Sequence, residues 1–96
     1  MLKTPEYLAA QDEVRRDNIL AILCEAPSVG FTKLAITRQL ASLHTSIAAK
    51  QLNEDLDYLS DRALATVVDK SAVSILRRYR ATADGRDYCL AKGLSQ

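Results

Sequence analysis

The sequence predicts a mainly helical α+β domain in which three helices precede a small β-hairpin and a fourth helix. Apolar residues recur at helical spacing up to Asp61, two short stretches at 65–69 and 75–81 have strand character, and Thr82 opens a further helix. The 96 residues include only three glycines and two prolines, which is the profile of one compact domain. We therefore expect a single domain over 1–96 with the element order H-H-H-E-E-H.

The first predicted helix runs from the start signal Thr4-Pro5-Glu6 to Glu25. A capping hydroxyl, a proline and an early carboxylate are typical of a helix N-terminus, and Pro27-Ser28-Val29-Gly30 favours a turn after it. Residues 1–13 form a helical extension that either packs against a partner subunit in a homodimer or lies across its own domain. Ile19, Ile22, Leu23 and Ala26 are expected to face the core, whereas Arg15, Arg16 and Asp17 are expected mostly on the solvent side.

The second predicted helix begins after Thr32, which is a suitable N-cap. Phe31 and Ile36 are spaced as a hydrophobic staple across this start. Ile36, Leu40 and Leu43 would form the inner face of the helix. The polar residues expected outside or partly outside the core are Lys33, Thr37, Arg38 and Gln39.

The third predicted helix follows the turn His44-Thr45-Ser46, in which Thr45 or Ser46 would be the N-cap. Leu52, Leu56 and Leu59 recur at i, i+4 and i+7, which predicts a buried stripe. Two helices joined by so short a turn have the helix-turn-helix layout. The opposite, polar face carries Lys50, Asn53, Glu54, Asp57 and Asp61.

The hairpin is predicted from a β-branched strand at 65–69 and a basic strand at 75–81. The connecting loop, 69–74, lacks the Asn-Gly or Asp-Gly signal of a tight turn, so we expect a loosely specified hairpin. Thr82 then caps a last helix that ends at Lys92-Gly93, leaving a short tail at 93–96. On the second strand, Ile75, Tyr79 and Ala81 are expected to point inward, Leu76, Arg78 and Arg80 outward, and Arg77 to lie at the edge.

Three runs of this sequence carry a resemblance to winged helix-turn-helix proteins of the bacterial regulator type. They are Asp55-Leu56-Asp57-Tyr58-Leu59, Ala63-Leu64-Ala65, and the run from Tyr79 to Arg86. More narrowly, the chain is similar to small regulator-like proteins of Mu-like phages and prophages. The resemblance implies a transcriptional regulator that binds double-stranded DNA. Two features depart from the family pattern: Ala63 replaces a usual glycine, and Ala48-Ala49 replace polar or basic residues.

The candidate DNA-binding residues fall into three groups. Polar side chains at the start of the third helix suit phosphates and base edges, and the basic side chains of the second helix and the wing suit phosphates. The alternatives are that these polar residues only solvate an outer face, or that the wing arginines pair with Glu54, Asp55 or Asp57. The groups are Thr45, Ser46, Lys50, Gln51 and Asn53; Lys33 and Arg38; and Lys70, Arg77, Arg78 and Arg80.

A second function class competes with DNA binding. The acidic residues Glu54, Asp57 and Asp61 suit a basic protein partner better than phosphate, which favours an adaptor or modulator of a phage or host protein. The charge distribution leaves both classes open, because the chain has a net charge of only +1 while residues 65–82 carry four basic residues and one acidic residue.

Several other functions find no support in the sequence. Cys24 and Cys89 make no metal-ligand pattern and are expected to be buried thiols, and His44 is expected at the surface. No nucleophile-base pair, phosphate loop or metal cluster indicates an enzyme, a cofactor or a metal. No signal peptide or membrane-length apolar run is found, so a cytoplasmic protein without membrane association is expected.

Overall fold

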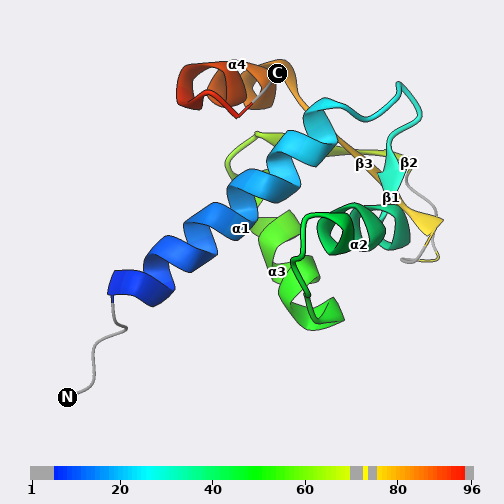
Figure 1. Cartoon of the computed structure of the whole chain (residues 1–96). Helices are drawn as coiled ribbons and strands as arrows, with labels where there is room; N and C mark the ends of the chain where they lie inside the picture. The colour runs from blue at the N-terminus through cyan, green and yellow to red at the C-terminus, as the bar shows by residue number, and fades with distance from the viewer. Residues whose placement is uncertain (1–5, 70–72, 74–75, 95–96) are drawn as a thin grey trace.

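The computed structural model describes residues 6–69, 73 and 76–94. In Figure 1 the helix α1 crosses the domain diagonally, with α4 on one side of it and α2 and α3 on the other. The fold is a winged helix of the α+β class, as predicted. The elements in chain order are α1 (Glu6–Cys24), β1 (Phe31–Thr32), α2 (Lys33–Ser42), α3 (Ala49–Asp61), β2 (Ala65–Asp69), β3 (Arg78–Ala81) and α4 (Ala83–Lys92).

The strand β1 was missing from the predicted order H-H-H-E-E-H, so that order is corrected. β1 pairs antiparallel with β3, Phe31 opposite Tyr79, and the three-stranded sheet has the order β1-β3-β2. Gly30 brings β1 close to β3: its φ is +77°, and a Cβ there would lie 2.8 Å from the Tyr79 carbonyl oxygen. A strand of two residues is too short to show any alternation in the sequence, which is why it was not predicted.

The hydrophobic core lies where α1 meets the other three helices and the sheet. α1 contributes Ile19, Leu20, Ile22 and Leu23, and the predicted leucine stripe of α3 is buried. Leu43, predicted on the inner face of α2, is instead exposed because it is the C-cap and the chain leaves the helix there. The buried hydrophobic residues of the other elements are Ile36, Leu40, Leu52, Leu56, Leu59, Ala65, Tyr79, Ala81 and Cys89.

Two predicted helix caps are confirmed and one is wrong. The hydroxyl oxygens of Thr32 and Thr82 accept hydrogen bonds from the amides of Ala35 and Gly85, at 3.3 and 3.0 Å, and α4 ends as expected on Gly93. Neither Thr45 nor Ser46 caps α3, because the helix begins at Ala49 with Ala48 as N-cap and no capping side chain. His44 takes a positive φ of 61°, which directs the chain into a longer connection than the three-residue turn that was expected.

The prediction that Arg15 and Arg16 lie mostly on the solvent side is wrong. The Arg15 Nε and Nη2 atoms donate to the two carboxylate oxygens of Asp55, at 2.5 and 3.1 Å, and the Arg16 Nε lies 3.4 Å from Asp55 Oδ1. Asp55 is fully buried, and the Arg15 side chain is only 16 % exposed. This ion pair attaches α1 to α3. Asp17 also has a partner, since its carboxylate accepts a hydrogen bond from Lys92 Nζ at 3.1 Å.

The wing consists of β2 and β3, which pair antiparallel from Ala65 opposite Ala81 to Asp69 opposite Arg78. A bulge interrupts the ladder between Val67 and Asp69. Tyr79 and Ala81 point inward as predicted, whereas Ile75 and Lys70 lie outside the described residues. β3 itself begins only at Arg78, three residues later than predicted.

Candidate nucleic-acid interface

The outer face of α3 changes chemical character along the helix. The leucine stripe faces the core, and all five polar residues predicted on the opposite face are exposed. The first turn of α3 contains no acidic residue, and Lys50 is its basic one. Glu54, Asp57 and Asp61 all lie beyond Asn53, so the carboxylates occupy the later turns. The start of α3 is therefore the part of its outer face suited to an anionic ligand.

The N-terminus of α3 also presents backbone donors. The first intrahelical hydrogen bond runs from the Leu52 amide to the Ala48 carbonyl oxygen, at 3.0 Å, and no side chain caps the helix. The first amides of a helix have no partner within the helix, and the helix dipole places partial positive charge there. Phosphate oxygens accept hydrogen bonds from amides in this arrangement.

A groove of about 440 Å³ separates the first halves of α2 and α3. It brings together two predicted residues from different helices, Lys33 and Asn53, and adds Thr37. Its other lining residues are apolar: Leu34, which is 53 % exposed, Ile47, Ala49 and Leu52. Sequence reasoning did not select Leu34 or Ile47, although Ala48-Ala49 did signal that this helix start would be apolar.

The structure separates Thr45 and Ser46 from this groove. Both precede α3 in the connection from α2, and Ser46 is exposed. Thr45 is half-buried and lines a hollow beside α1, together with Gln11, Val14, Arg15 and Asn18. Gln51, on α3 itself, is half-buried. Of the five residues predicted to read DNA from this region, Lys50 and Asn53 are therefore the two that are exposed on the helix.

Arg78 and Arg80 are half-buried on β3 and alternate with the buried Tyr79 and Ala81. Among the side chains that the structure describes, no carboxylate forms an ion pair with either arginine. The predicted alternative that Asp55 neutralises the wing is wrong, because its partners are Arg15 and Arg16. The two wing arginines therefore keep their charge available at the surface.

Arg77 lies just before β3, close to Tyr79. Burial raises the pKa of the Tyr79 hydroxyl, and the positive charge of Arg77 opposes part of that increase. Asp57 acts in the same direction as burial, so α3 and the wing are close enough here for their charges to interact. Asp57, in the later turns of α3, therefore lies near enough to Tyr79 of the wing to influence its hydroxyl.

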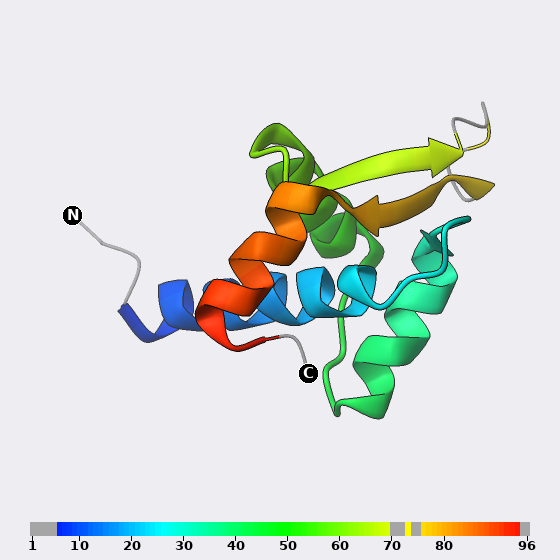
Figure 2. The same cartoon turned by 90° about the horizontal axis from the view of Figure 1, so that it is seen from above.

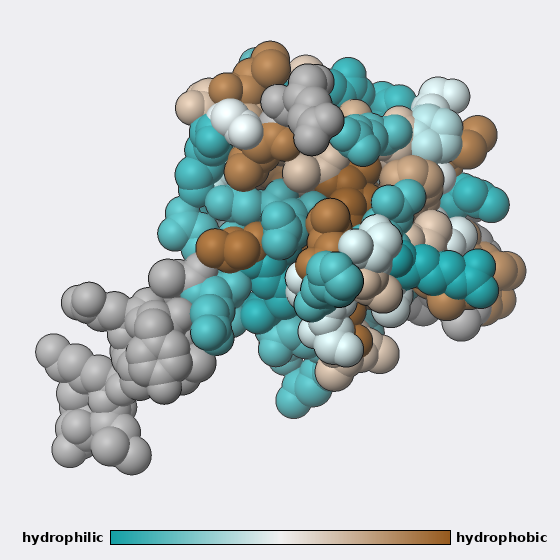
Figure 3. Space-filling model, in the orientation of Figure 1, coloured by the Kyte–Doolittle hydropathy of each residue, from teal (hydrophilic) through white to brown (hydrophobic). Residues whose placement is uncertain are grey.

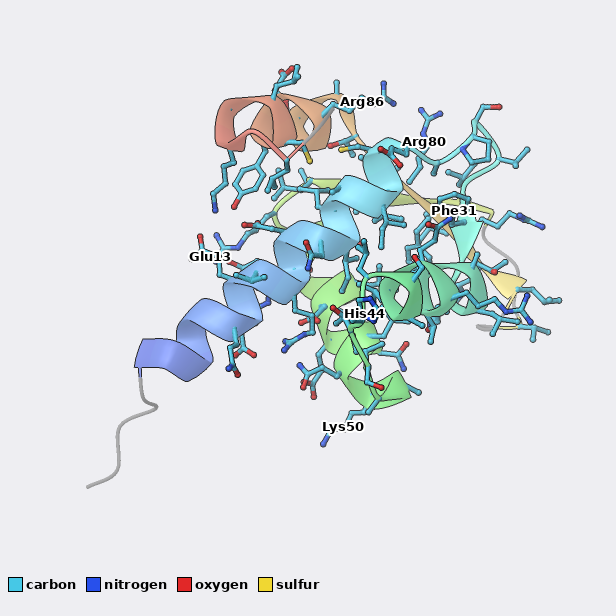
Figure 4. All side chains as sticks on the ribbon, in the orientation of Figure 1. Glu13, Phe31, His44, Lys50, Arg80 and Arg86 are labelled. Carbon is cyan, nitrogen blue, oxygen red and sulfur yellow. The ribbon has the colours of Figure 1, made fainter. Side chains whose placement is uncertain are left out.

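The basic residues do not form one continuous group. In Figure 4, Lys50 lies at the lower end of α3, whereas Arg80 lies on the opposite side of the domain, near Arg86 and α4. Arg80 pairs with Thr66 in the sheet, close to the base of the wing, and Arg78 is two residues nearer its tip. Arg38 is exposed on α2. Lys50 and Arg80 thus lie at opposite ends of the domain in this view.

Neither a metal site nor a membrane-spanning helix is formed by the described residues. They contain no group of three histidine, cysteine or acidic side chains that could hold a metal ion. None of the helices in the described part of the chain is long and apolar enough to cross a membrane. The exposed side chains of Figure 3 mix hydrophilic and apolar character, with apolar ones gathered over α4 at the upper edge.

A solved structure shares this architecture. It is a PadR-like transcription factor from Bacteroides fragilis, 15 % identical in sequence, with a TM-score of 0.75 over 91 % of this chain and 84 % of the other. No family model matches the sequence, and no curated protein matches it. At this level of identity the similarity concerns the fold, and it places the chain among winged-helix structures.

Proposed function

We propose that this protein is a winged-helix transcriptional regulator that binds double-stranded DNA. One observation supports this most directly: α3 begins with an uncapped, carboxylate-free turn that carries Lys50, beside a groove lined by Lys33 and Asn53. The burial of Asp55 against α1 adds to it, because it removes one carboxylate from the surface of α3. The similarity in fold to a transcription factor is consistent with this role.

In this proposal the three groups of residues have different tasks. Phosphates are bound by four basic residues, which positions the protein without reading sequence: Lys33, Arg38, Arg77 and Arg78. Lys50 and Asn53 lie where a helix in the major groove reaches base edges, and Asn is suited to adenine. Lys70 remains a predicted phosphate contact outside the described residues. Four predicted residues are expected to contribute less to DNA binding, because they lie before α3, are half-buried, or are far from Lys50: Thr45, Ser46, Gln51 and Arg80.

A fluorescence anisotropy titration with a labelled duplex, repeated over a range of salt concentrations, tests the proposal. Four phosphate contacts give a slope of log K against log salt of roughly −3.6, at about −0.9 per contact. The double variant Lys50→Ala with Arg78→Ala is expected to weaken binding and to make this slope less steep. Arg86→Ala is the matched control, because Arg86 is an exposed arginine on α4, away from Lys50. Equal effects of the two variants would refute the proposed face.

We also propose that the protein acts as a homodimer through the first half of α1. Figures 1 and 2 show that the first turns of α1 extend beyond the rest of the domain. Val14, in the first half of α1, is 58 % exposed. A dimer would place two α3 helices on successive half-sites, about 34 Å apart. Sedimentation equilibrium should give a dimer for the natural chain and a monomer for Val14→Asp. The origin in a phage or prophage stays a prediction from the sequence alone.

A second candidate function rests on Glu54, Asp57 and Asp61, which are exposed along the later turns of α3. This acidic face suits a basic protein partner. The substitution Asp57→Asn with Glu54→Gln separates the two functions. It is expected to strengthen DNA binding at low salt by removing repulsion of phosphates, whereas it would weaken attachment to a basic partner. Duplex binding that is absent even at low salt would favour the protein partner.

A further inference from the structure

Two cysteine sulfurs that are distant in sequence meet at the contact between α1 and α4. Cys24 is the last residue of α1, and Cys89 lies in the last half of α4. Their Sγ atoms are 3.0 Å apart, and both are free thiols. The Sγ of Cys24 is also 3.9 Å from the carbonyl oxygen of Gly85. The prediction of buried thiols therefore holds for Cys89 but is wrong for Cys24, which is half-buried. The fold also places the two sulfurs in contact, which the sequence did not indicate.

The surrounding structure fixes the two helices on either side of this pair. At Gly85 the helix α4 approaches the residue just before β2 so closely that a Cβ would lie 2.0 Å from the carbonyl oxygen of Leu64. Further along α4, Lys92 Nζ lies 2.7 Å from a carboxylate oxygen of Glu13 and 3.1 Å from one of Asp17, both on α1. Because both regions of α4 are held, the sulfurs cannot easily separate. A disulfide requires them to approach by only about 1 Å.

We propose that Cys24 and Cys89 are a modification site at which a hydroperoxide forms an intramolecular disulfide. The Cys24 thiolate attacks the distal peroxide oxygen and breaks the O–O bond, which gives a sulfenic acid on Cys24 and releases water or an alcohol. The Cys89 sulfur then attacks the Cys24 sulfur, the S–O bond breaks, and the Cys89 proton leaves with the hydroxyl as water. Two thiols thus lose two electrons, and the peroxide gains them.

The two cysteines have different environments, which assigns their roles. Cys24 is half-buried and Cys89 is fully buried, so Cys24 is the more accessible of the two to a small oxidant. Burial, together with the neighbouring Cys24 thiol, raises the pKa of Cys89 to about 12, and thiols react as thiolates. Cys24 is therefore the thiol that attacks the peroxide, and Cys89 is the resolving thiol. The same high pKa makes the second step slow compared with the reaction of an exposed dithiol.

The disulfide would join the end of α1 to α4 across most of the chain, so it stabilises the folded state by restricting the unfolded one. It would lie beside Gly85 on α4, on the other side of α1 from α2 and α3, as Figure 1 shows. Oxidation is therefore expected to raise the melting temperature while leaving the groove between α2 and α3 intact. This inference does not depend on whether the protein binds DNA.

The test is intact mass spectrometry of the natural chain after exposure to excess hydrogen peroxide and alkylation with N-ethylmaleimide. The expected product is a monomer that has lost two hydrogens and takes up the alkylating agent only after reduction with dithiothreitol. Its melting temperature should rise and return on reduction. If folded, peroxide-treated protein still takes up two alkyl groups, is overoxidised without cross-linking, or forms only disulfide-linked dimers, the proposal is wrong.

Two serine variants assign the steps. Cys89→Ser should accumulate a sulfenic acid at Cys24 that dimedone traps, since the resolving thiol is gone. Cys24→Ser should resist peroxide far longer, because the remaining thiol is buried. Faster oxidation of Cys24→Ser than of Cys89→Ser would reverse the assigned roles. Circular dichroism of each variant establishes that it is folded. The mass-spectrometric test for the disulfide in the natural chain does not depend on either variant.

Discussion

Arg15 and Arg16 of α1 differ from Arg78 and Arg80 of the wing in what surrounds them. The first pair meets Asp55, a fully buried carboxylate, whereas the second pair meets no carboxylate among the described side chains. Both pairs were predicted to be turned away from the core. The acidic run of α3 therefore serves two purposes, because Asp55 holds the fold together while Glu54 and Asp57 remain at the surface.

We expect the largest loss of stability when the buried ion pair between Asp55 and Arg15 is broken. Asp55→Ala leaves the guanidinium of Arg15 partly buried without its partner, and breaking such a pair typically costs about 3–5 kcal/mol of unfolding free energy. Asp57→Ala, two residues further along the same helix and exposed, should change stability by no more than about 0.5 kcal/mol. Urea denaturation of both variants measures the difference. Similar losses in the two would show that Asp55 does not support the fold.

Arg15 and Arg16 of α1 should differ in how much each contributes to stability. Arg15 donates two hydrogen bonds to Asp55, whereas Arg16 makes one long contact of 3.4 Å and stacks over the Tyr58 ring at 3.9 Å. Hydrogen bonds to charged groups contribute about 1.5–3 kcal/mol. Arg15→Ala is therefore expected to destabilise by about 2–3 kcal/mol and Arg16→Ala by about 1 kcal/mol. A larger loss for Arg16→Ala would contradict the assignment of Arg15 as the main partner.

Alkaline pH should destabilise the α1–α4 contact. In the folded state the pKa of Cys89 is raised from its ordinary 9.0 to about 12, so its neutral form contributes stability below pH 9. As pH rises from about 9 to 12, the unfolded chain loses this proton first, and the unfolding free energy falls by up to about 1.4 kcal/mol per pH unit. The unfolding free energy of Cys89→Ala, measured by denaturation across this pH range, should fall less steeply than that of the natural chain. An unchanged slope would contradict the burial of this thiol.

The smallest effect on stability is expected in the wing. Arg78→Ala and Arg80→Ala remove side chains for which the described residues supply no ion pair, so each should change the unfolding free energy by less than about 0.5 kcal/mol. Arg78→Ala should instead make the salt slope of DNA binding less steep by about 1, and Arg80→Ala by less. A loss of stability comparable to that of Arg15→Ala would show that the wing arginines support the fold.

Most of the fold could be predicted from local spacing. The caps at Thr32 and Thr82 and the leucine stripe of α3 each depend on residues within one helix, and all three are confirmed. The two-residue strand β1 could not be predicted, because its pairing partner is 48 residues away, at Tyr79 opposite Phe31. The burial of Asp55 did have a signal: it follows Leu52 by three residues and therefore lies on the buried stripe.

The candidate site was predicted less completely than the fold. Residue type and helical face identified Lys50 and Asn53 as exposed, and they are. Their placement relative to other elements depends on tertiary packing, so neither the meeting of Lys33 with Asn53 in one groove nor the distance between Lys50 and Arg80 could be read from spacing. The contact between Cys24 and Cys89 was missed for the same reason.

In the proposed complex, duplex DNA contacts the first turns of α3 and the adjoining part of α2, and not the acidic later turns. Amide chemical shifts of the ¹⁵N-labelled protein during titration with duplex DNA test this placement. We expect changes of chemical shift concentrated at residues 49–53 and around Lys33, with little change on α4. Shifts confined to residues 54–61, or no shifts at low salt, would contradict it.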